Sequence, residues 1–474
     1  MRKLLFLVLA LAFVFALPAA AQEEGDAELP DFIDRTECEV DLSGETIPLY
    51  HFGDISQAYA AITQPLLTGI ADAMDYFNAR GGVCGADLEQ INRDTENNPD
   101  QTQAIYDDFA TRDPEPLLFV LYSSPDSEQL RDQLAEDEIP VLISAGSVEG
   151  LYGEGGDEPG WIFATNPLYI DQLGMFCEYV GSNPDSFPES PTIGYISWPG
   201  AFGEAAFTEE GIAYCESQGV GFIENPELFL PTATDVFTQV QNLVDQGANI
   251  LYTNTLASGP PVIARTVVEL GLENDVVLGS VNWGMDSSAG LIDQQTRGEN
   301  GLPALDGMYG SFPFSWFTET NIEGIAFLNE QFAFYAEEEG RSGEDQLRLR
   351  NISYVLGWTV VDLYIELLTQ TANRIGAETY TDMTGADVYE TLQDINYNAV
   401  GIQQIDFEDG ELRDVELNRI VQYGFLNAEG TGPAASGAEA DVEGGFFKPI
   451  IVPLMEFEDT PDLRPGMMEM EEEE

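Results

Sequence analysis

The sequence predicts an α/β protein made of two doubly wound, Rossmann-like lobes. Three observations lead to this prediction. Short apolar runs alternate with helical patterns, the alternation starts again after residues 161–167, and a chain of 474 residues is too long for a single hydrophobic core. Such alternation is typical of a parallel sheet with helices on both faces.

The first half of the chain carries four strand patterns separated by helical patterns. The stretch FNARGGVCG ends the first helix, because Gly81 and Gly82 readily adopt the left-handed backbone that closes a helix. The predicted strands are 46–52, 88–93, 117–122 and 140–144. The predicted helices are 65–79, 100–112 and 126–137.

The second half repeats this alternation and then changes character. The predicted strands are 192–197, 219–224, 249–254 and 276–281. The predicted helices are 168–181, 201–218, 234–246 and 259–272. Residues 307–316 form a further joint, two long helices follow at 321–340 and 351–374, and residues 402–425 predict a strand, a turn and a strand. The low-complexity segment 429–445 is expected to be mobile.

The two ends of the chain lie outside this pattern. Residues 1–21 predict a signal peptide, because Arg2 and Lys3 precede an apolar run that ends in three alanines. Residues 22–45 form an acidic leader, and residues 457–474 predict a disordered acidic tail. No later apolar run approaches the ~20 residues that span a bilayer, so we expect an exported, soluble protein.

The charge of the chain limits its partners. It has 85 acidic and 17 basic residues, for a net charge of −68. Such a surface repels nucleic acid and anionic membranes. We interpret the acidic residues as a solvated coat suited to salty surroundings.

The four cysteines of an exported chain predict two disulfides, and three pairings are possible. Cys38 lies shortly before the first strand and Cys84 shortly before the second. If these strands are parallel neighbours, both cysteines lie at the same sheet edge. We therefore predict the pairs Cys38–Cys84 and Cys177–Cys215.

The sequence offers no catalytic constellation, metal site or cofactor motif. The single histidine, His51, stands at the end of a predicted strand and is interpreted as structural. The remaining candidates for a ligand site are short polar segments that follow predicted strands, called strand tips here. They are YSS at 122–124, SAGS at 144–147, NT at 254–255 and NW at 282–283. In open parallel sheets, ligands bind beyond these strand ends.

The stretch GIADAMDYFNARGGVCGADLEQINRD (69–94) resembles the first helix, turn and strand of type I periplasmic binding proteins of ABC importers, above all the branched-chain amino-acid (leucine/isoleucine/valine) class. The resemblance continues through LYSSPDSEQLRDQLAEDEIPVLISAGSVEGL, FGEAAFTEEGIAYCESQGV, FTQVQNLVDQGANILYTN and GMYGSFPF, over roughly residues 44–425. It implies two lobes joined by a three-segment hinge. The first lobe would comprise 46–165 plus 312–416, and the second 166–311 plus 417–456.

The resemblance also implies a ligand site between the lobes. Ser123, Ser124 and Ser147 would hold an acid group together with the backbone of Ala145 and Gly146. The other candidates are Tyr59, Phe202, Asn254, Thr255, Asn282 and Trp283. One departure concerns Asn282, which stands where amino-acid binders of this class carry an acid for the ammonium group.

We therefore expect a monomeric solute-binding protein without catalysis, which delivers a small polar solute (an amino acid, an amide or a related compound) to an ABC permease. One alternative is a ligand sensor of the same fold that is coupled to a signalling receptor. A second alternative is an amidohydrolase-like enzyme. The missing histidine pairs and nucleophile elbow weigh against the enzyme.

Overall fold

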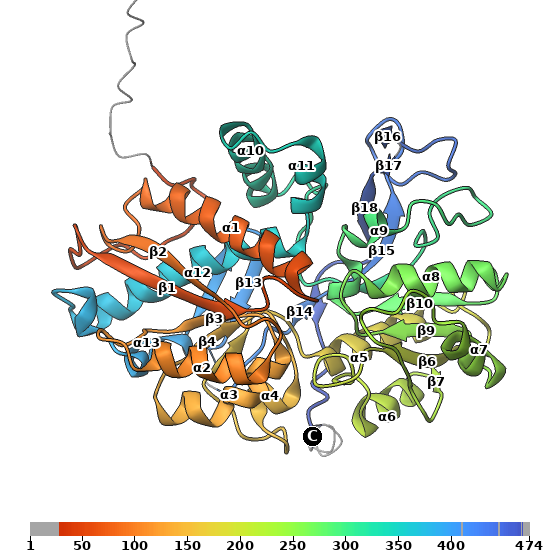
Figure 1. Cartoon of the computed structure of the whole chain (residues 1–474), viewed down its shortest axis with the longest axis horizontal. Coiled ribbons are helices and arrows are strands. Elements are labelled where there is room, and N and C mark those ends of the chain that lie inside the picture. Colours follow the sequence, from red (N-terminus) through yellow and green to blue (C-terminus); the bar gives the residue numbers. More distant parts are fainter. Residues whose placement is uncertain (1–27, 409–410, 444–445, 466, 468–474) are drawn as a thin grey trace, which may run out of the picture.

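The computed structural model describes residues 28–408, 411–443, 446–465 and 467, and it contains two large β-sheets, each with helices around it (Figure 1). We call the parts built on these sheets the first and the second lobe. The predicted α/β class with parallel sheets is confirmed. The predicted signal peptide and residues 22–27 lie outside the described residues.

The first sheet has five parallel strands in the order β2-β1-β3-β4-β5. Its strands are β1 (Thr46–Gly53), β2 (Asp87–Asp94), β3 (Phe119–Leu121), β4 (Val141–Ile143) and β5 (Ile162–Ala164). Its connecting helices are α1 (Ala60–Asn78), α2 (Pro99–Ala110), α3 (Ser124–Glu136) and α4 (Val148–Tyr152). The four strand predictions are confirmed. Strand β5 is absent from them, because residues 161–167 were interpreted as the junction after which the alternation starts again.

The second sheet has eight strands in the order β18-β15-β11-β10-β9-β6-β7, with β8 paired to β6. Its strands are β6 (Thr192–Ser197), β7 (Gly221–Phe222), β8 (Glu227–Leu228), β9 (Ile250–Thr253), β10 (Val277–Ser280), β11 (Tyr309–Ser311), β15 (Ile420–Phe425) and β18 (Pro449–Pro453). Its helices are α5 (Tyr169–Ser182), α6 (Glu209–Ser217), α7 (Phe237–Asp245), α8 (Gly259–Glu269), the 3-10 helix η1 (Asn282–Met285) and α9 (Ala289–Ile292). Strand β15 is antiparallel to its neighbour β11, and β18 is antiparallel to β15.

The remaining elements come from the last third of the chain. The helices are α10 (Glu323–Glu338), α11 (Gly343–Leu349), α12 (Ile352–Ile375), the 3-10 helix η2 (Tyr380–Asp382) and α13 (Gly385–Leu392). The small sheets pair β12 (Asn396–Ala399) with β13 (Gln403–Asp406), β14 (Leu417–Asn418) with β19 (Glu458–Asp459), and β16 (Val442–Glu443) with β17 (Phe446–Phe447). Helix α12 lies beneath α1 in the first lobe (Figure 1).

The two strands expected within 402–425 form as β13 and β15. They do not pair with each other, because β13 pairs with β12 whereas β15 joins the second sheet. One local prediction is wrong: the helix expected at 201–218 forms only over α6. Its first part is a turn, in which a Cβ on Gly203 would lie 2.1 Å from the Trp198 carbonyl oxygen.

The C-terminal segment is more ordered than expected. Strand β19 pairs with β14, and the Leu463 N–H donates a hydrogen bond to Asp171 at 2.8 Å. Leu463 is 1% exposed, so burial fixes this part of the predicted disordered tail. Ala440 of the low-complexity segment forms a β-bridge with Asn427, so the described part of this segment has defined structure.

Helices α1 and α12 cross closely because both carry a glycine at the contact. A Cβ on Gly357 would lie 2.6 Å from the Ile70 nitrogen, and one on Gly69 would lie 2.5 Å from the Tyr354 carbonyl oxygen. By length and composition α12 could cross a membrane, which the sequence analysis did not expect of any later segment. Its apolar window is entirely buried inside the protein, as in the core helix of a globular fold.

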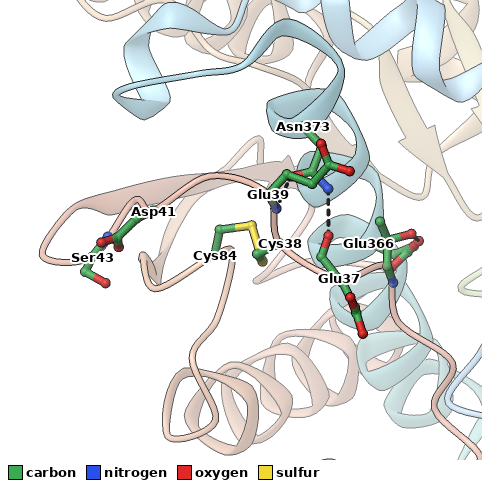
Figure 2. Close-up of a disulfide and its surroundings, with 9 residues drawn as sticks. Glu37, Cys38, Glu39, Asp41, Ser43, Cys84, Glu366 and Asn373 are labelled. Carbon is green, nitrogen blue, oxygen red and sulfur yellow. Dashed lines mark hydrogen bonds between the residues drawn. A yellow bond between two sulfur atoms is a disulfide. The ribbon is translucent and has the colours of Figure 1, made fainter.

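Both predicted disulfides are confirmed, Cys38–Cys84 and Cys177–Cys215. Figure 2 shows the first beside Glu37 and Glu39 of the acidic leader. Asn373 of α12 binds the backbone of both glutamates, accepting from the Glu39 N–H and donating to the Glu37 carbonyl oxygen at 2.8 Å each. The described part of the leader is therefore fixed to the first lobe.

We expect the melting temperature to rise when sodium chloride is raised from 0.1 M to 1 M. The net charge of −68 opposes compaction, and this salt range shortens the Debye length from ~10 Å to ~3 Å. Differential scanning calorimetry at pH 7.5 measures the effect. A flat or falling curve would contradict the acidic-coat interpretation.

Candidate functional site

A small cavity lies between the lobes, beyond the carboxyl ends of strands from both sheets. Its volume is about 10 Å³, which is room for about one water molecule, so the two lobes are closed over it. The lining residues from the first lobe are Tyr59, Ile62, Tyr122, Ser123, Ser124 and Pro125. Those from the second lobe are Tyr169, Phe202, Leu256 and Trp283. We call this space the aromatic cavity.

Two serines reach the aromatic cavity at the N-terminus of α3. Ser123 is the N-cap, and its Oγ accepts a hydrogen bond from the Asp126 N–H at 3.4 Å. Ser124 is 2% exposed, and its Oγ is close enough to the Tyr169 hydroxyl to lower the pKa of that group, yet it makes no complete hydrogen bond. An unsatisfied buried hydroxyl costs roughly 1–3 kcal/mol. Ser124 is therefore available to a polar atom of a solute.

The second lobe contributes three aromatic side chains that support one another. The Trp283 Nε1–H donates a hydrogen bond to the Tyr169 hydroxyl at 3.2 Å. The rings of Tyr169 and Phe202 meet edge to face, with centroids 5.3 Å apart. Burial raises the pKa of Tyr169, which therefore stays protonated at neutral pH. Together these contacts hold one wall of the cavity in place.

The predicted asparagines and Thr255 lie behind this wall. Asn254 Nδ2 donates to the Phe202 carbonyl oxygen at 2.7 Å, and the Thr255 hydroxyl accepts from Thr253 at 3.1 Å. Asn282 donates its backbone N–H to Gln172 at 3.0 Å. All three side chains are fully buried. The amide oxygen of Asn254 and both side-chain polar atoms of Asn282 make no hydrogen bond.

The predicted stretch from Ala145 to Ser147 does not line the aromatic cavity. A Cβ on Gly146 would lie 2.5 Å from the Pro167 carbonyl oxygen, so this glycine permits a close backbone contact. Ser147 is the N-cap of α4 and accepts a hydrogen bond from the Gly150 N–H at 3.3 Å. A serine hydroxyl that follows a strand can accept a hydrogen bond from the N-terminus of the next helix, and the same hydroxyl could also bind a ligand.

Ser147 instead lines a neighbouring groove of about 450 Å³ that also runs between the lobes. Five glutamates line this acidic groove: Glu128, Glu149, Glu154, Glu204 and Glu210. None of the described residues that line it is Lys, Arg or His. The groove and the cavity are adjacent, because Ile170 and Ala201 line the groove whereas their chain neighbours Tyr169 and Phe202 line the cavity.

Sequence reasoning missed Tyr122, Tyr169 and Gln172. Tyr122 stands in the quoted YSS tip, but an aromatic residue after an apolar run is also typical of a core. Gln172 Oε1 accepts from the Asn282 N–H and from the Ser311 hydroxyl at 2.7 Å. No local sequence signal marks Gln172, since the two donors to its Oε1 lie more than 100 residues away.

The titratable groups elsewhere indicate structural roles. His51 is fully buried, and its Nδ1 lies 2.7 Å from the Val120 carbonyl oxygen. Burial lowers the pKa of His51 to about 4, so the ring is neutral at pH 7. Within the described ranges, no group of three or more His, Cys, Asp or Glu side chains could hold a metal ion.

We expect a higher melting temperature at pH 5.5 than at pH 8. Burial raises the pKa of Asp126 and Asp286 above its usual range, and that of Glu128 to about 7. These carboxyls bind protons more tightly in the folded state, so their contribution to stability is present at low pH and is lost as the pH rises, for Glu128 through about 7. The lowered pKa of His51 has the opposite effect, because this one group makes the fold less stable as the pH falls from about 6.5 to 4. Thermal unfolding at constant ionic strength measures the difference. A melting temperature that is lower at pH 5.5 than at pH 8 would contradict this prediction.

The profile of a family described as periplasmic binding protein matches residues 48–414. A search of curated proteins finds no match.

Solved structures with the same fold cover most of the chain. A branched-chain amino-acid ABC transporter protein from Thermus thermophilus with bound valine is 18% identical, with a TM-score of 0.70, over 89% of this chain and 98% of that one. A fatty acid ABC transporter substrate-binding protein from Thermomonospora curvata is 15% identical, with a TM-score of 0.65, over 90% and 96%. A solute-binding protein from Rhodopseudomonas palustris BisB5 in complex with 3,4-dihydroxybenzoic acid is 14% identical, with a TM-score of 0.65, over 89% and 99%. At these identities the likeness concerns the fold alone.

Proposed function

Because the chain belongs to the periplasmic binding protein family, we propose that it captures a small polar solute between its lobes and delivers it to an ABC permease. The solute would be an amino acid, an amide or a related compound. In this proposal the protein is exported, soluble, monomeric and without catalytic activity. The structural neighbours bind small solutes of different chemistry, such as valine and 3,4-dihydroxybenzoic acid, which supports a solute site but leaves the identity of the solute open.

The observation that carries this proposal is the buried Ser124 hydroxyl, which lines the aromatic cavity without a hydrogen-bond partner. Further buried polar atoms without hydrogen bonds belong to second-lobe residues that do not line the cavity: Trp198 Nε1, Asn254 Oδ1, Asn282 Oδ1 and Asn282 Nδ2. Buried polar groups in folded proteins are almost always paired. A polar solute in the cavity would pair the Ser124 hydroxyl.

Closure needs a hinge, and the chain crosses between the lobes more than once. We assign residues 46–165 plus 312–416 to the first lobe and 166–311 plus 417–456 to the second. The C-terminal segment adds a contact with both lobes. The Arg464 guanidinium lies 4.2 Å from the ring centroid of Tyr152 in the first lobe, while Leu463 binds Asp171 of the second.

A thermal-shift screen of amino acids, amides and short carboxylates, followed by calorimetric titration of each hit, tests the proposed function. We expect a stoichiometry of one and a change in tryptophan fluorescence, because Trp198 and Trp283 lie at the site. Weakened binding in a Phe202→Leu variant would locate the solute at the aromatic cavity. Absence of binding by every solute, or turnover of any solute, would contradict the proposal.

A further inference from the structure

We propose that the protein has a second binding site, for a small ligand with a carboxylate or phosphate group, in a basic pocket of about 330 Å³ between the lobes. We call this space the arginine pocket, after Arg350, which lines it. No described residue lines both the arginine pocket and the aromatic cavity, so this inference goes beyond the proposed solute site and does not depend on it.

The arginine pocket lies where elements of the two lobes face each other. One side is formed by the C-terminal end of α11 and by residues 316–320, and the other by α9 and by the ends of β15 and β18. Arg341, just before α11, pairs with Asp72 of α1 at 2.7 Å, which fixes the first side to the first lobe. Strands β15 and β18 belong to the second sheet, and α11 and β18 stand along the same edge of the molecule (Figure 1). A ligand in this pocket would therefore contact both lobes.

The charge of the arginine pocket differs from that of larger spaces on this protein. Its described lining includes Arg350 and Lys448 and no Asp or Glu. The acidic groove, a pocket of about 620 Å³ beside α8 and a pocket of about 400 Å³ beside β13 are lined by acidic residues and by no described basic residue. In a chain with 85 acidic and 17 basic residues, a pocket with this lining is a local site of positive potential, which attracts an anion.

The guanidinium of Arg350 is held in position but is not neutralised. Its Nη2 donates a hydrogen bond to Asn329 Oδ1 at 2.6 Å, and the group lies 4.9 Å from the ring centroid of Phe317. No carboxylate of the described residues pairs with Arg350, whereas Arg348, two residues earlier, pairs with Glu344 at 2.7 Å. A guanidinium has further N–H groups and binds the paired oxygens of a carboxylate or phosphate. Arg350 is therefore the residue that would bind the ligand.

Lys448 and Ser287 approach Arg350 from the second lobe. The Ser287 hydroxyl donates a hydrogen bond to the Arg350 carbonyl oxygen at 2.6 Å, which holds the backbone of Arg350 against this lobe. The Lys448 ammonium pairs with Asp441 at 2.9 Å, so its positive charge is partly compensated. We infer that Arg350 binds one negative group of the ligand and that a second negative group toward Lys448 strengthens binding less. A dicarboxylate suits this arrangement.

Titration with small anions tests the site. Succinate and inorganic phosphate are the probes, and succinamide is the uncharged analogue of succinate. We expect calorimetric titration of the full mature chain at constant ionic strength to show one bound anion per chain for at least one of the two anions, and no binding of succinamide. The affinities of succinate and phosphate show which of the two groups the pocket prefers.

Variants of the basic residues locate the bound anion. Arg350→Gln is expected to weaken binding about tenfold or more, because it removes a charged hydrogen-bond donor. Lys448→Gln should weaken binding less, because Lys448 already pairs with Asp441. Arg348→Gln is the matched control, since it removes the same charge from the same helix, but its side chain is 71% exposed and does not line the pocket. We expect this control to leave the affinity unchanged.

The outcomes separate the arginine pocket from the aromatic cavity. If Phe202→Leu weakens binding of the anion and Arg350→Gln does not, the anion is a solute of the aromatic cavity and the assignment to the arginine pocket is wrong. Equal losses in Arg350→Gln and Arg348→Gln also overturn the assignment, because they report only the loss of a positive charge. If neither anion binds, the assignment fails, and the proposed solute-binding function is unaffected.

Discussion

The Asp362→Ala variant is expected to lose about 3–5 kcal/mol of unfolding free energy, the cost of breaking a buried ion pair. Asp362 of α12 is fully buried and forms an ion pair with Arg35, whose side chain is 11% exposed. Its other oxygen accepts hydrogen bonds from the Tyr397 hydroxyl at 2.9 Å and the Val400 N–H at 2.7 Å. The substitution would leave a guanidinium, a hydroxyl and an amide without their shared acceptor.

Urea unfolding monitored by circular dichroism measures this loss. The matched control is Asp108→Ala, because the Arg112–Asp108 pair lies at the C-terminal end of α2, with Arg112 just beyond the helix, and the Asp108 side chain is 60% exposed. Such a pair contributes at most about 1 kcal/mol. A variant of Asp362 that is as stable as the control variant would show that the leader and the β12–β13 hairpin are not anchored through this carboxylate.

The order of the elements could be predicted from the sequence because it depends on local patterns. Apolar runs such as 46–52 and 192–197 are long enough to mark strands, and the predicted parallel neighbours placed Cys38 beside Cys84. Pairing between distant segments has no such local signal. Strand β12 was not predicted, and β19 was taken for part of a tail, because their pairing with β13 and β14 forms only in the folded chain.

The candidate site was predictable to a similar extent. The strand tips identified Ser123, Ser124 and Trp283, and these residues line the aromatic cavity. The same reasoning also selected Ser147, which caps a helix, because both roles use a hydroxyl beyond a strand end. Tyr169 was missed, since an aromatic residue in an apolar helix usually belongs to the core.

Ser124→Ala is expected to weaken binding of the solute five- to 150-fold while leaving the melting temperature of the unliganded protein unchanged. The reason is that Ser124 Oγ is buried at the cavity and makes no complete hydrogen bond, so its removal breaks none in the unliganded fold. A hydrogen bond to a solute at that position would contribute about 1–3 kcal/mol, which corresponds to this range of affinity.

Ser147→Ala is the matched contrast and should behave in the opposite way. Ser147 caps α4 and lies outside the aromatic cavity, so its removal should cost roughly 0.5–2 kcal/mol of stability and change affinity less than twofold. Calorimetric titration and thermal unfolding of both variants with the best ligand of the screen measure the two effects. If Ser147→Ala loses affinity and Ser124→Ala does not, the solute binds in the acidic groove, and the aromatic cavity is not the binding site.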